Sequence, residues 1–156
     1  MHKRKIVVIS LLLMFLLTIV ATGCGQKSEN TLDDQNTAIT GVATEFINAL
    51  GANNKSKIKS FLTKEHLDGI TDTIFLVSDE AAEEYDIEIK NIFTEAVSYS
   101  AYEEVEDITA DLVVFYTVVI SKDGEIVEER RIRESFIFQE VNSRWLIASN
   151  KREIAR

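Results

Sequence analysis

Hydrophobic and polar positions follow three different patterns along this chain. Residues 6–20 are apolar, with only Ser10 and Thr18 as interruptions. Further on, apolar residues recur at the spacing of one helix face, at Ile39, Val42, Ala43, Phe46, Ile47 and Leu50. From residue 87 onward, β-branched and aromatic residues alternate roughly with polar ones, which predicts strands. The patterns therefore predict an apolar N-terminal segment at 1–23, a polar stretch at 24–36 and one folded domain at 37–156.

Three short helices are expected after the amphipathic one, which ends at Gly51. Each follows a residue whose side chain can accept a hydrogen bond from the first turn of a helix, and these caps are Ser56, Thr63 and Ser78. Asp79 and Glu80 come directly after the last cap, where acidic side chains favour the positive end of the helix dipole. The last helix is therefore expected over residues 79–85.

Four strands are expected from four β-rich runs, at residues 87–102, 108–120, 126–141 and 145–149. Asp123-Gly124 separates the second run from the third and is typical of a two-residue hairpin turn, because glycine tolerates a positive φ. Asn142-Ser143 is expected to make the next turn. This order predicts an α+β fold, with N-terminal helices packed on one face of a curved four-stranded antiparallel sheet.

The N-terminal segment has the organisation of an export signal. Lys3, Arg4 and Lys5 precede the apolar run, and small residues follow it. The run is shorter than the roughly 20 apolar residues that a membrane-spanning helix needs. A core helix that is apolar on every face is not expected at the terminus of so small a protein. The segment is therefore expected to direct the rest of the chain across a membrane.

The run Ala21-Thr22-Gly23-Cys24 resembles the lipobox of bacterial lipoproteins, with Ala21 where leucine is commonest. The resemblance implies cleavage before Cys24 by signal peptidase II, a diacylglycerol on the Cys24 thiol and an acyl chain on the new amine. An ordinary secretory signal would leave Cys24 unexplained. Two or more acyl chains hold a protein stably on a bilayer. The mature protein is thus expected to be lipid-anchored on the extracytoplasmic face of the cell membrane, with residues 24–36 as a flexible tether.

Charge limits the partners that the folded domain can have. The chain carries 17 basic and 26 acidic residues, a formal charge of −9. Removal of the expected signal peptide with its three basic residues leaves 14 against 26, a formal charge of −12. An acidic surface repels nucleic acid and anionic lipid headgroups. No nucleic-acid partner is therefore expected, and the covalent lipid is the expected contact with the membrane.

Residues suited to catalysis or metal binding are sparse. Cys24 is the only cysteine, so the chain can form no internal disulfide. The sequence contains no glycine-rich phosphate loop, no His-Glu-x-x-His and no Gly-x-Ser-x-Gly motif. His66 is expected to be a solvated surface side chain, and the acidic clusters at 79–86 and 103–107 are expected to be solvated helix faces and turns. No catalytic residue, metal site or cofactor is therefore expected.

The arginine-rich stretch after the hairpin turn carries a candidate binding site. A two-residue turn would place Tyr116 opposite Arg131, and Val114 opposite Arg133. Tyr116, Arg131 and Arg133 would then share a face and form an anion-binding pocket, since arginine presents a bidentate fork to carboxylate or phosphate. The alternative, which is favoured, is an exposed ladder of Arg and Glu pairs with a bulge that shifts the register. A one-residue slip reverses every side chain on a strand.

Three short runs are similar to the nuclear-transport-factor-2-like (cystatin-like cone) superfamily, namely Phe46-Ile47-Asn48-Ala49-Leu50, Ser60-Phe61-Leu62-Thr63 and Arg144-Trp145-Leu146-Ile147. The resemblance covers roughly residues 37–152. It implies a pocket enclosed by the helices and the concave face of the sheet. Members of the superfamily include steroid isomerases, dehydratases and many non-catalytic binding domains, so the fold alone does not choose a function.

Two functions are therefore expected to compete. The first is a membrane-anchored extracytoplasmic lipoprotein whose domain binds a small ligand or an envelope protein without catalysis. The alternative is a small isomerase- or dehydratase-like enzyme with a pocket between helices and sheet. The enzyme would need a buried acid–base pair with shifted pKa values in a deep pocket. A pocket filled by Phe and Ile side chains would instead favour the binding domain.

Overall fold

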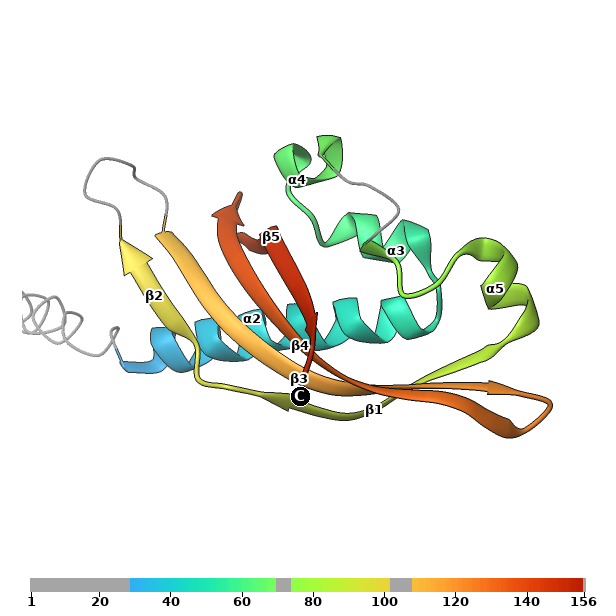
Figure 1. Ribbon diagram of the computed structural model, residues 1–156. Helices are drawn as coiled ribbons and strands as arrows, with labels where there is room; N and C mark the ends of the chain where they lie inside the picture. The colour runs from blue at the N-terminus through green and yellow to red at the C-terminus, as the bar shows by residue number, and fades with distance from the viewer. Residues whose placement is uncertain (1–28, 70–73, 102–107, 156) are drawn as a thin grey trace, which may run out of the picture. The chain divides into compact units, whose positions relative to one another are not determined.

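A computed structural model of the chain describes residues 29–69, 74–101 and 108–155 (Figure 1). The expected signal peptide and Cys24 lie outside the described residues. The chain divides into two compact units, Met1–Gln35 and Asn36–Arg156, and the fold described below is that of the second unit. Across the described ranges, no helix combines the length and the apolar character needed to span a membrane.

Helices occupy most of the first part of the described chain. They are α2 (Glu29–Gly51), α3 (Lys55–Ser60), α4 (Lys64–Asp68) and α5 (Asp79–Glu84). Helix α2 starts within the segment expected to be a flexible tether, so residues 29–36 of that segment are helical, while 24–28 lie outside the described residues. Asp33 and Asp34 lie near the N-terminus of α2, where the helix dipole favours acidic side chains.

Side-chain caps fix where the short helices begin. The Thr63 and Ser78 side chains each accept a hydrogen bond from the backbone N–H three residues further on, at 3.2 and 3.3 Å, as expected. The expectation for Ser56 is wrong. Asn54 caps α3 instead, because its side-chain oxygen accepts from the Lys57 N–H at 3.0 Å, and Ser56 lies inside the first turn.

The sheet has five antiparallel strands rather than the four expected. They are β1 (Asp86–Thr94), β2 (Ser98–Ala101), β3 (Ile108–Lys122), β4 (Glu125–Val141) and β5 (Arg144–Ile154). The strand order is β1-β3-β4-β5, and β2 also pairs with β3 (Figure 1). The first expected strand is thus divided into β1 and β2, which pair in series with β3. The register of β1 with β3 shifts between Lys90 and Phe93. Asn91, which lies at this shift, has a φ of +53°.

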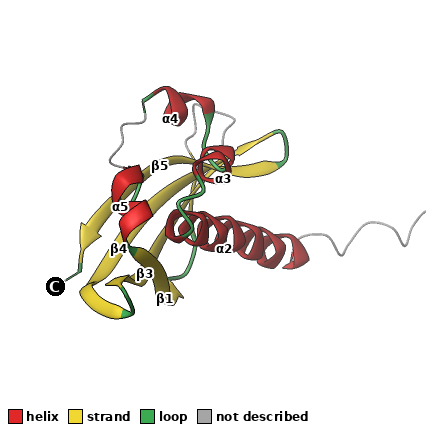
Figure 2. Cartoon of the chain, turned by 90° about the vertical axis from the view of Figure 1, so that its right-hand side faces the viewer, coloured by secondary structure: helices red, strands yellow, loops and turns green. Residues whose placement is uncertain are grey.

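Helix α2 packs along one face of the sheet, here called the inner face (Figure 2). The inner face carries Leu112, Val114, Tyr116, Phe136 and Phe138, which are buried with the predicted apolar face of α2. Phe46 of α2 makes edge contacts with Phe136 and Phe61, at ring-centroid distances of 5.7 and 6.4 Å. The helical spacing seen in the sequence therefore matches the face of α2 that forms the core.

The opposite face of the sheet, here called the outer face, is partly open to solvent, although Thr117 of β3 is only 5% exposed there. Phe93 of β1 pairs with Phe115 of β3 on this face, and their ring centroids lie 6.5 Å apart. Phe93 is 63% exposed and Ile137 of β4 is 43% exposed. Alternating positions of β3 and β4 thus point to environments of opposite character, as the pleat of a strand requires.

Two glycines of α2 differ in the space around them, which predicts opposite effects of alanine. A Cβ on Gly51 would lie 2.6 Å from Cγ1 of Ile89, so Gly51→Ala is expected to lower the free energy of unfolding by about 1–2 kcal/mol through overpacking. A Cβ on Gly41 would meet nothing within 4 Å, so Gly41→Ala is expected to raise it by about 0.5–1 kcal/mol. Urea unfolding of the two variants measures both changes, and equal effects would contradict the close packing of Gly51 on Ile89.

Candidate functional site

The β3–β4 hairpin has the predicted turn but a different register along its length. Lys122 pairs with Glu125, and Asp123-Gly124 has the positive φ values that a tight turn needs. The register then shifts by one residue next to Ile120. The expected pairing of Tyr116 with Arg131 is therefore wrong. The bulge of the alternative is present, but its exposed ladder is not, because Glu134 is fully buried. A single inserted residue on one strand is enough to reverse which face each later side chain takes.

The shift separates the three residues nominated for an anion-binding pocket. Tyr116 pairs with Ile132 and lies on the inner face. Arg131 and Arg133 pair with Thr117 and Phe115 and lie on the outer face. Tyr116 therefore does not share a face with the two arginines, and its hydroxyl has another partner.

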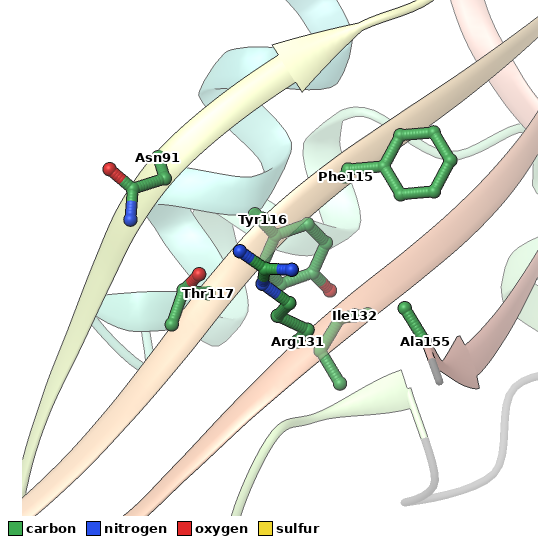
Figure 3. A pocket seen from close by; sticks show the side chains of 7 residues that line it. All are labelled: Asn91, Phe115, Tyr116, Thr117, Arg131, Ile132 and Ala155. Carbon is green, nitrogen blue, oxygen red and sulfur yellow. The ribbon is translucent and has the colours of Figure 1, made fainter.

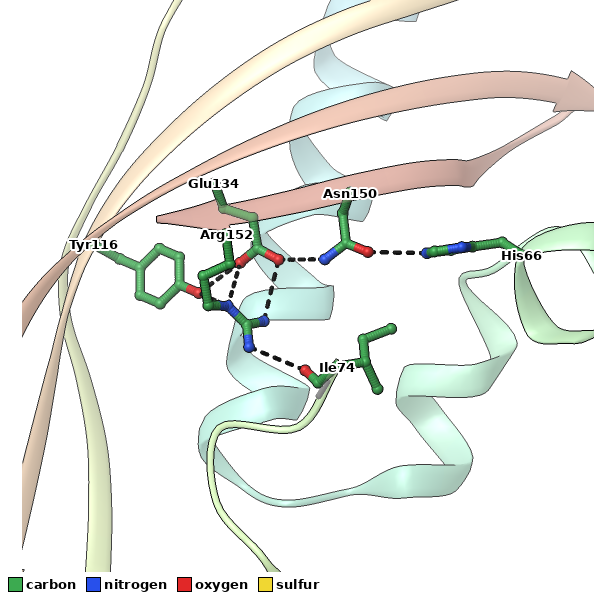
Figure 4. Close-up of polar contacts among 6 residues, drawn as sticks. All are labelled: His66, Ile74, Tyr116, Glu134, Asn150 and Arg152. Atoms are coloured by element: carbon green, nitrogen blue, oxygen red, sulfur yellow. Dashed lines mark hydrogen bonds and ion pairs between the residues drawn. The ribbon is translucent and has the colours of Figure 1, made fainter. Parts of the chain in front are cut away.

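A carboxylate is buried on the inner face. Glu134 is 0% exposed and lies directly opposite Arg152 in the pairing of β4 with β5. The Nε and Nη2 atoms of Arg152 each lie 3.1 Å from a different oxygen of the carboxylate (Figure 4). The two side chains thus form a bidentate ion pair, and the buried negative charge has a positive partner in the adjacent strand.

Tyr116 and a backbone carbonyl complete the surroundings of this ion pair. The Tyr116 hydroxyl donates to Oε2 of Glu134 at 2.5 Å and accepts from Nε of Arg152 at 3.1 Å. Burial raises the pKa of Tyr116 far above its usual value, and the negative charge of Glu134 raises it further. The phenol therefore stays protonated as a donor. The Nη1 atom of Arg152 donates to the carbonyl of Ile74 at 3.1 Å.

The guanidinium of Arg152 keeps its charge in this environment. Burial by itself opposes the charged form, but the adjacent Glu134 carboxylate outweighs it, so the pKa of Arg152 lies above its ordinary value. The Glu134 carboxylate is thus the principal stabilising partner of the Arg152 guanidinium.

The hydrogen-bond network extends from Glu134 to helix α4. Asn150 donates from Nδ2 to Oε1 of Glu134 at 2.5 Å, and its Oδ1 lies 2.9 Å from Nε2 of His66 (Figure 4). Because an amide oxygen only accepts, Nε2 of His66 must carry the proton. The expectation of a solvated His66 is therefore wrong, since the side chain is half-buried and bonded to β5.

The arrangement suits a structural role rather than proton transfer. Both oxygens of the Glu134 carboxylate already accept hydrogen bonds, from Arg152, Tyr116 and Asn150. Among the described residues, no buried side-chain nitrogen or oxygen lacks a partner. A general base must reach a substrate proton with a free lone pair in a cleft. A hollow of about 300 Å³ borders Arg152, but its lining does not include Glu134, whose two oxygens are already engaged.

One sequence signal could have located this network. Glu134 has the same strand parity as Ile132, Phe136 and Phe138, so the alternation places it among core residues. A charged residue at a core position needs a paired opposite charge. The sequence does not say which of its many basic residues is that partner, because Arg152 lies on another strand.

A shallow hollow lies on the outer face of the sheet. Its volume is about 390 Å³, and its lining comprises Asn91, Phe115, Tyr116, Thr117, Arg131, Ile132 and Ala155 (Figure 3). Two of the three nominated residues, Tyr116 and Arg131, thus border one hollow even though they belong to different faces. The third, Arg133, donates to Ser135 at 3.1 Å and lies 3.8 Å from the Glu153 carboxylate.

The acidic cluster at 79–86 shows no arrangement for a metal ion, and the cluster at 103–107 lies outside the described residues. Within the described ranges, no group of three or more His, Cys, Asp or Glu side chains is placed to hold one. Asp79 lies 2.6 Å from the Lys55 ammonium, and Glu84 pairs with Lys122. The hydrogen bond from Lys55 lowers the pKa of Asp79 below its usual value.

Comparison with known proteins adds no relative to this picture. No protein-family model matches the chain, and a search of curated proteins finds no match either. Statements about function therefore depend on the residues of this chain and on the geometry described above.

Proposed function

We propose that this protein is a lipoprotein held by lipid on Cys24 at the extracytoplasmic face of the cell membrane, where its folded domain binds a small ligand or an envelope protein without catalysis. The proposal that the domain is not catalytic rests on Glu134, because both of its carboxylate oxygens already accept hydrogen bonds from neighbouring side chains. Its carboxylate is neutralised by Arg152 and hydrogen-bonded by Tyr116 and Asn150, so it has no lone pair for a substrate.

The packing of the interior supports the same choice. An isomerase or dehydratase would need a deep pocket with a carboxylate at its wall. The space between α2 and the inner face is instead filled by Phe46, Phe136, Phe138 and aliphatic side chains. One surface available for binding is the outer face, where Phe93 and Ile137 are exposed.

A feature of the sequence supports the lipid anchor, and a feature of the fold supports the superfamily. The basic residues, the apolar run and Ala21-Thr22-Gly23-Cys24 occur in the order that a lipoprotein signal requires. For the domain we extend the proposal to the nuclear-transport-factor-2-like superfamily, whose order of helices followed by an antiparallel sheet agrees with this chain. A fold of this kind serves binding domains and enzymes alike.

The anchor predicts a specific loss in a Cys24→Ala variant. Cells fed a labelled fatty acid should incorporate it into the wild-type protein and not into the variant, which is expected to keep its signal segment or be shed into the medium. The reason is that Cys24 supplies the thiol and the new amine that are acylated. Label retained in Cys24→Ala would contradict the anchor.

The same cells test the binding role. A photoreactive amino acid at Phe93, on the open outer face, is expected to form an adduct with a membrane or envelope component, whereas one at Lys59, which is exposed on α3, is not. An adduct that forms only at Phe93 and depends on Cys24 supports binding at the membrane surface. Equal labelling at Phe93 and Lys59 would count against a defined binding face.

A further inference from the structure

Three neighbouring strands each contribute a hydrogen-bond donor to the hollow on the outer face. Asn91 comes from β1, Thr117 from β3 and Arg131 from β4, and all three border the same hollow (Figure 3). Thr117 and Arg131 are direct partners in the strand register. A row of donors thus crosses the sheet at one level, opposite the face that packs on α2.

None of these three side chains has a hydrogen-bond partner among the residues that the structure describes. Thr117 is only 5% exposed, yet its hydroxyl makes no hydrogen bond with another described residue and is not sealed from solvent. The Asn91 amide and the Arg131 guanidinium likewise have no side-chain partner among the described residues. The Thr117 hydroxyl therefore reaches solvent while the rest of its residue is buried, and it can bind a ligand atom in place of water.

The backbone at Asn91 is shaped to turn its side chain toward the hollow. The register between β1 and β3 shifts between Lys90 and Phe93, so β1 has one residue more than its partner strand at this point. Asn91 has a φ of +53°, in the left-handed region where asparagine is tolerated better than most residues. Bulges of this kind redirect a side chain, and they occur often beside functional sites.

The charge of the lining is opposite to that of the protein. The chain has a formal charge of −9, but no acidic residue lines the hollow and Arg131 does. The neighbouring arginines of β4 are engaged, since Arg130 pairs with Glu128 and Arg133 with Glu153. Arg131 is therefore the β4 guanidinium whose fork is available to an anion.

We infer that this hollow binds a small organic carboxylate that carries an apolar group. Arg131 holds the carboxylate, Thr117 and Asn91 donate further hydrogen bonds to it, and the Phe115 ring at the side of the hollow contacts the apolar group. The volume of about 390 Å³ lies within the range of sites for small molecules. The inference rests on the proposed binding function and specifies the chemical class of its ligand.

Phenylacetate is a suitable probe because it joins a carboxylate to one aromatic ring. Calorimetric titration into the full-length lipidated protein in detergent is expected to show saturable binding. Phenylacetamide, which has the same shape without the charge, is expected to bind at least about tenfold more weakly, because a bidentate charged contact contributes about 1.5–3 kcal/mol. Equal affinity for the two compounds would overturn the inference.

Arg131→Gln and Arg133→Gln form a matched pair of variants. They lie two residues apart on the same face of β4, but only Arg131 borders the hollow. Arg131→Gln is expected to weaken phenylacetate binding at least about tenfold, and Arg133→Gln less than about twofold. Because Arg131 is exposed, its variant should unfold at the same urea concentration as the wild type.

The outcomes separate this inference from the proposed function. No binding of phenylacetate, or equal weakening by both variants, would overturn the carboxylate site. An adduct at Phe93 together with no phenylacetate binding would leave the proposed binding role standing and reject this ligand class alone. Loss of the amide signal shift of Asn91 in nuclear magnetic resonance, on titration of Arg131→Gln, would confirm that the ligand occupies this hollow.

Discussion

Replacing Arg152 with methionine is expected to lower the free energy of unfolding by about 3–5 kcal/mol, because the variant leaves the Glu134 carboxylate buried without its partner. Urea unfolding followed by the fluorescence of Trp145, the only tryptophan of the chain, measures the loss. A change below about 1 kcal/mol would contradict the view that Glu134 depends on this ion pair.

A second pair of variants shows whether the cost comes from the unpaired charge. The Glu134 side chain is fully buried, whereas that of Arg152 is 18% exposed and reaches solvent. Glu134→Gln, which leaves the arginine partly hydrated, is therefore expected to cost less than Arg152→Met. The double variant is expected to be more stable than Arg152→Met alone, because it removes both charges and keeps the volume of both side chains.

The second large effect is expected at Phe46, the aromatic residue through which α2 contacts the sheet. Phe46→Ala removes a fully buried ring that touches Phe61 and Phe136, and it is expected to cost about 3–5 kcal/mol. The loss combines the transfer free energy of the ring with the cavity left behind, and the same urea experiment measures it.

Phe93→Ala is the control for the Phe46 variant. Phe93 is also aromatic and also contacts another ring, that of Phe115, but it is 63% exposed. Its removal creates no enclosed cavity, so the expected cost is below about 1 kcal/mol. Similar costs at Phe46 and Phe93 would mean that the ring contacts, rather than burial, determine the stability.

The buried network also connects the segment between α3 and α5 to strand β5. His66 of α4 bonds to Asn150, and the Ile74 carbonyl accepts from Arg152, so hydrogen bonds add to the apolar contacts that attach this segment to the sheet. Helix α4 itself has no buried residue. Hydrogen bonds at both places thus fix the position of α4 and of Ile74 relative to β5.

The candidate site shows that sequence patterns did not predict which side chains share a face of the sheet. Tyr116 and Arg131 were nominated on the assumption of an unbroken register, and the structure places them on opposite faces because a bulge follows Ile120. The partner of Tyr116 is Glu134, which had no assigned role. Thr117 and Asn91, which border the hollow with Arg131, carried no motif that would have singled them out.

The sequence by itself determined the features that depend on residues close together in the chain. The apolar face of α2, the caps at Thr63 and Ser78 and the turn at Asp123-Gly124 all follow from local spacing and backbone preference. The tertiary structure alone decided the register of β3 with β4, the division of the first expected strand between Thr94 and Ser98, and the pairing of Glu134 with Arg152. These depend on contacts between segments far apart in the chain, where one inserted residue changes the face of a strand and many basic side chains compete for one buried carboxylate.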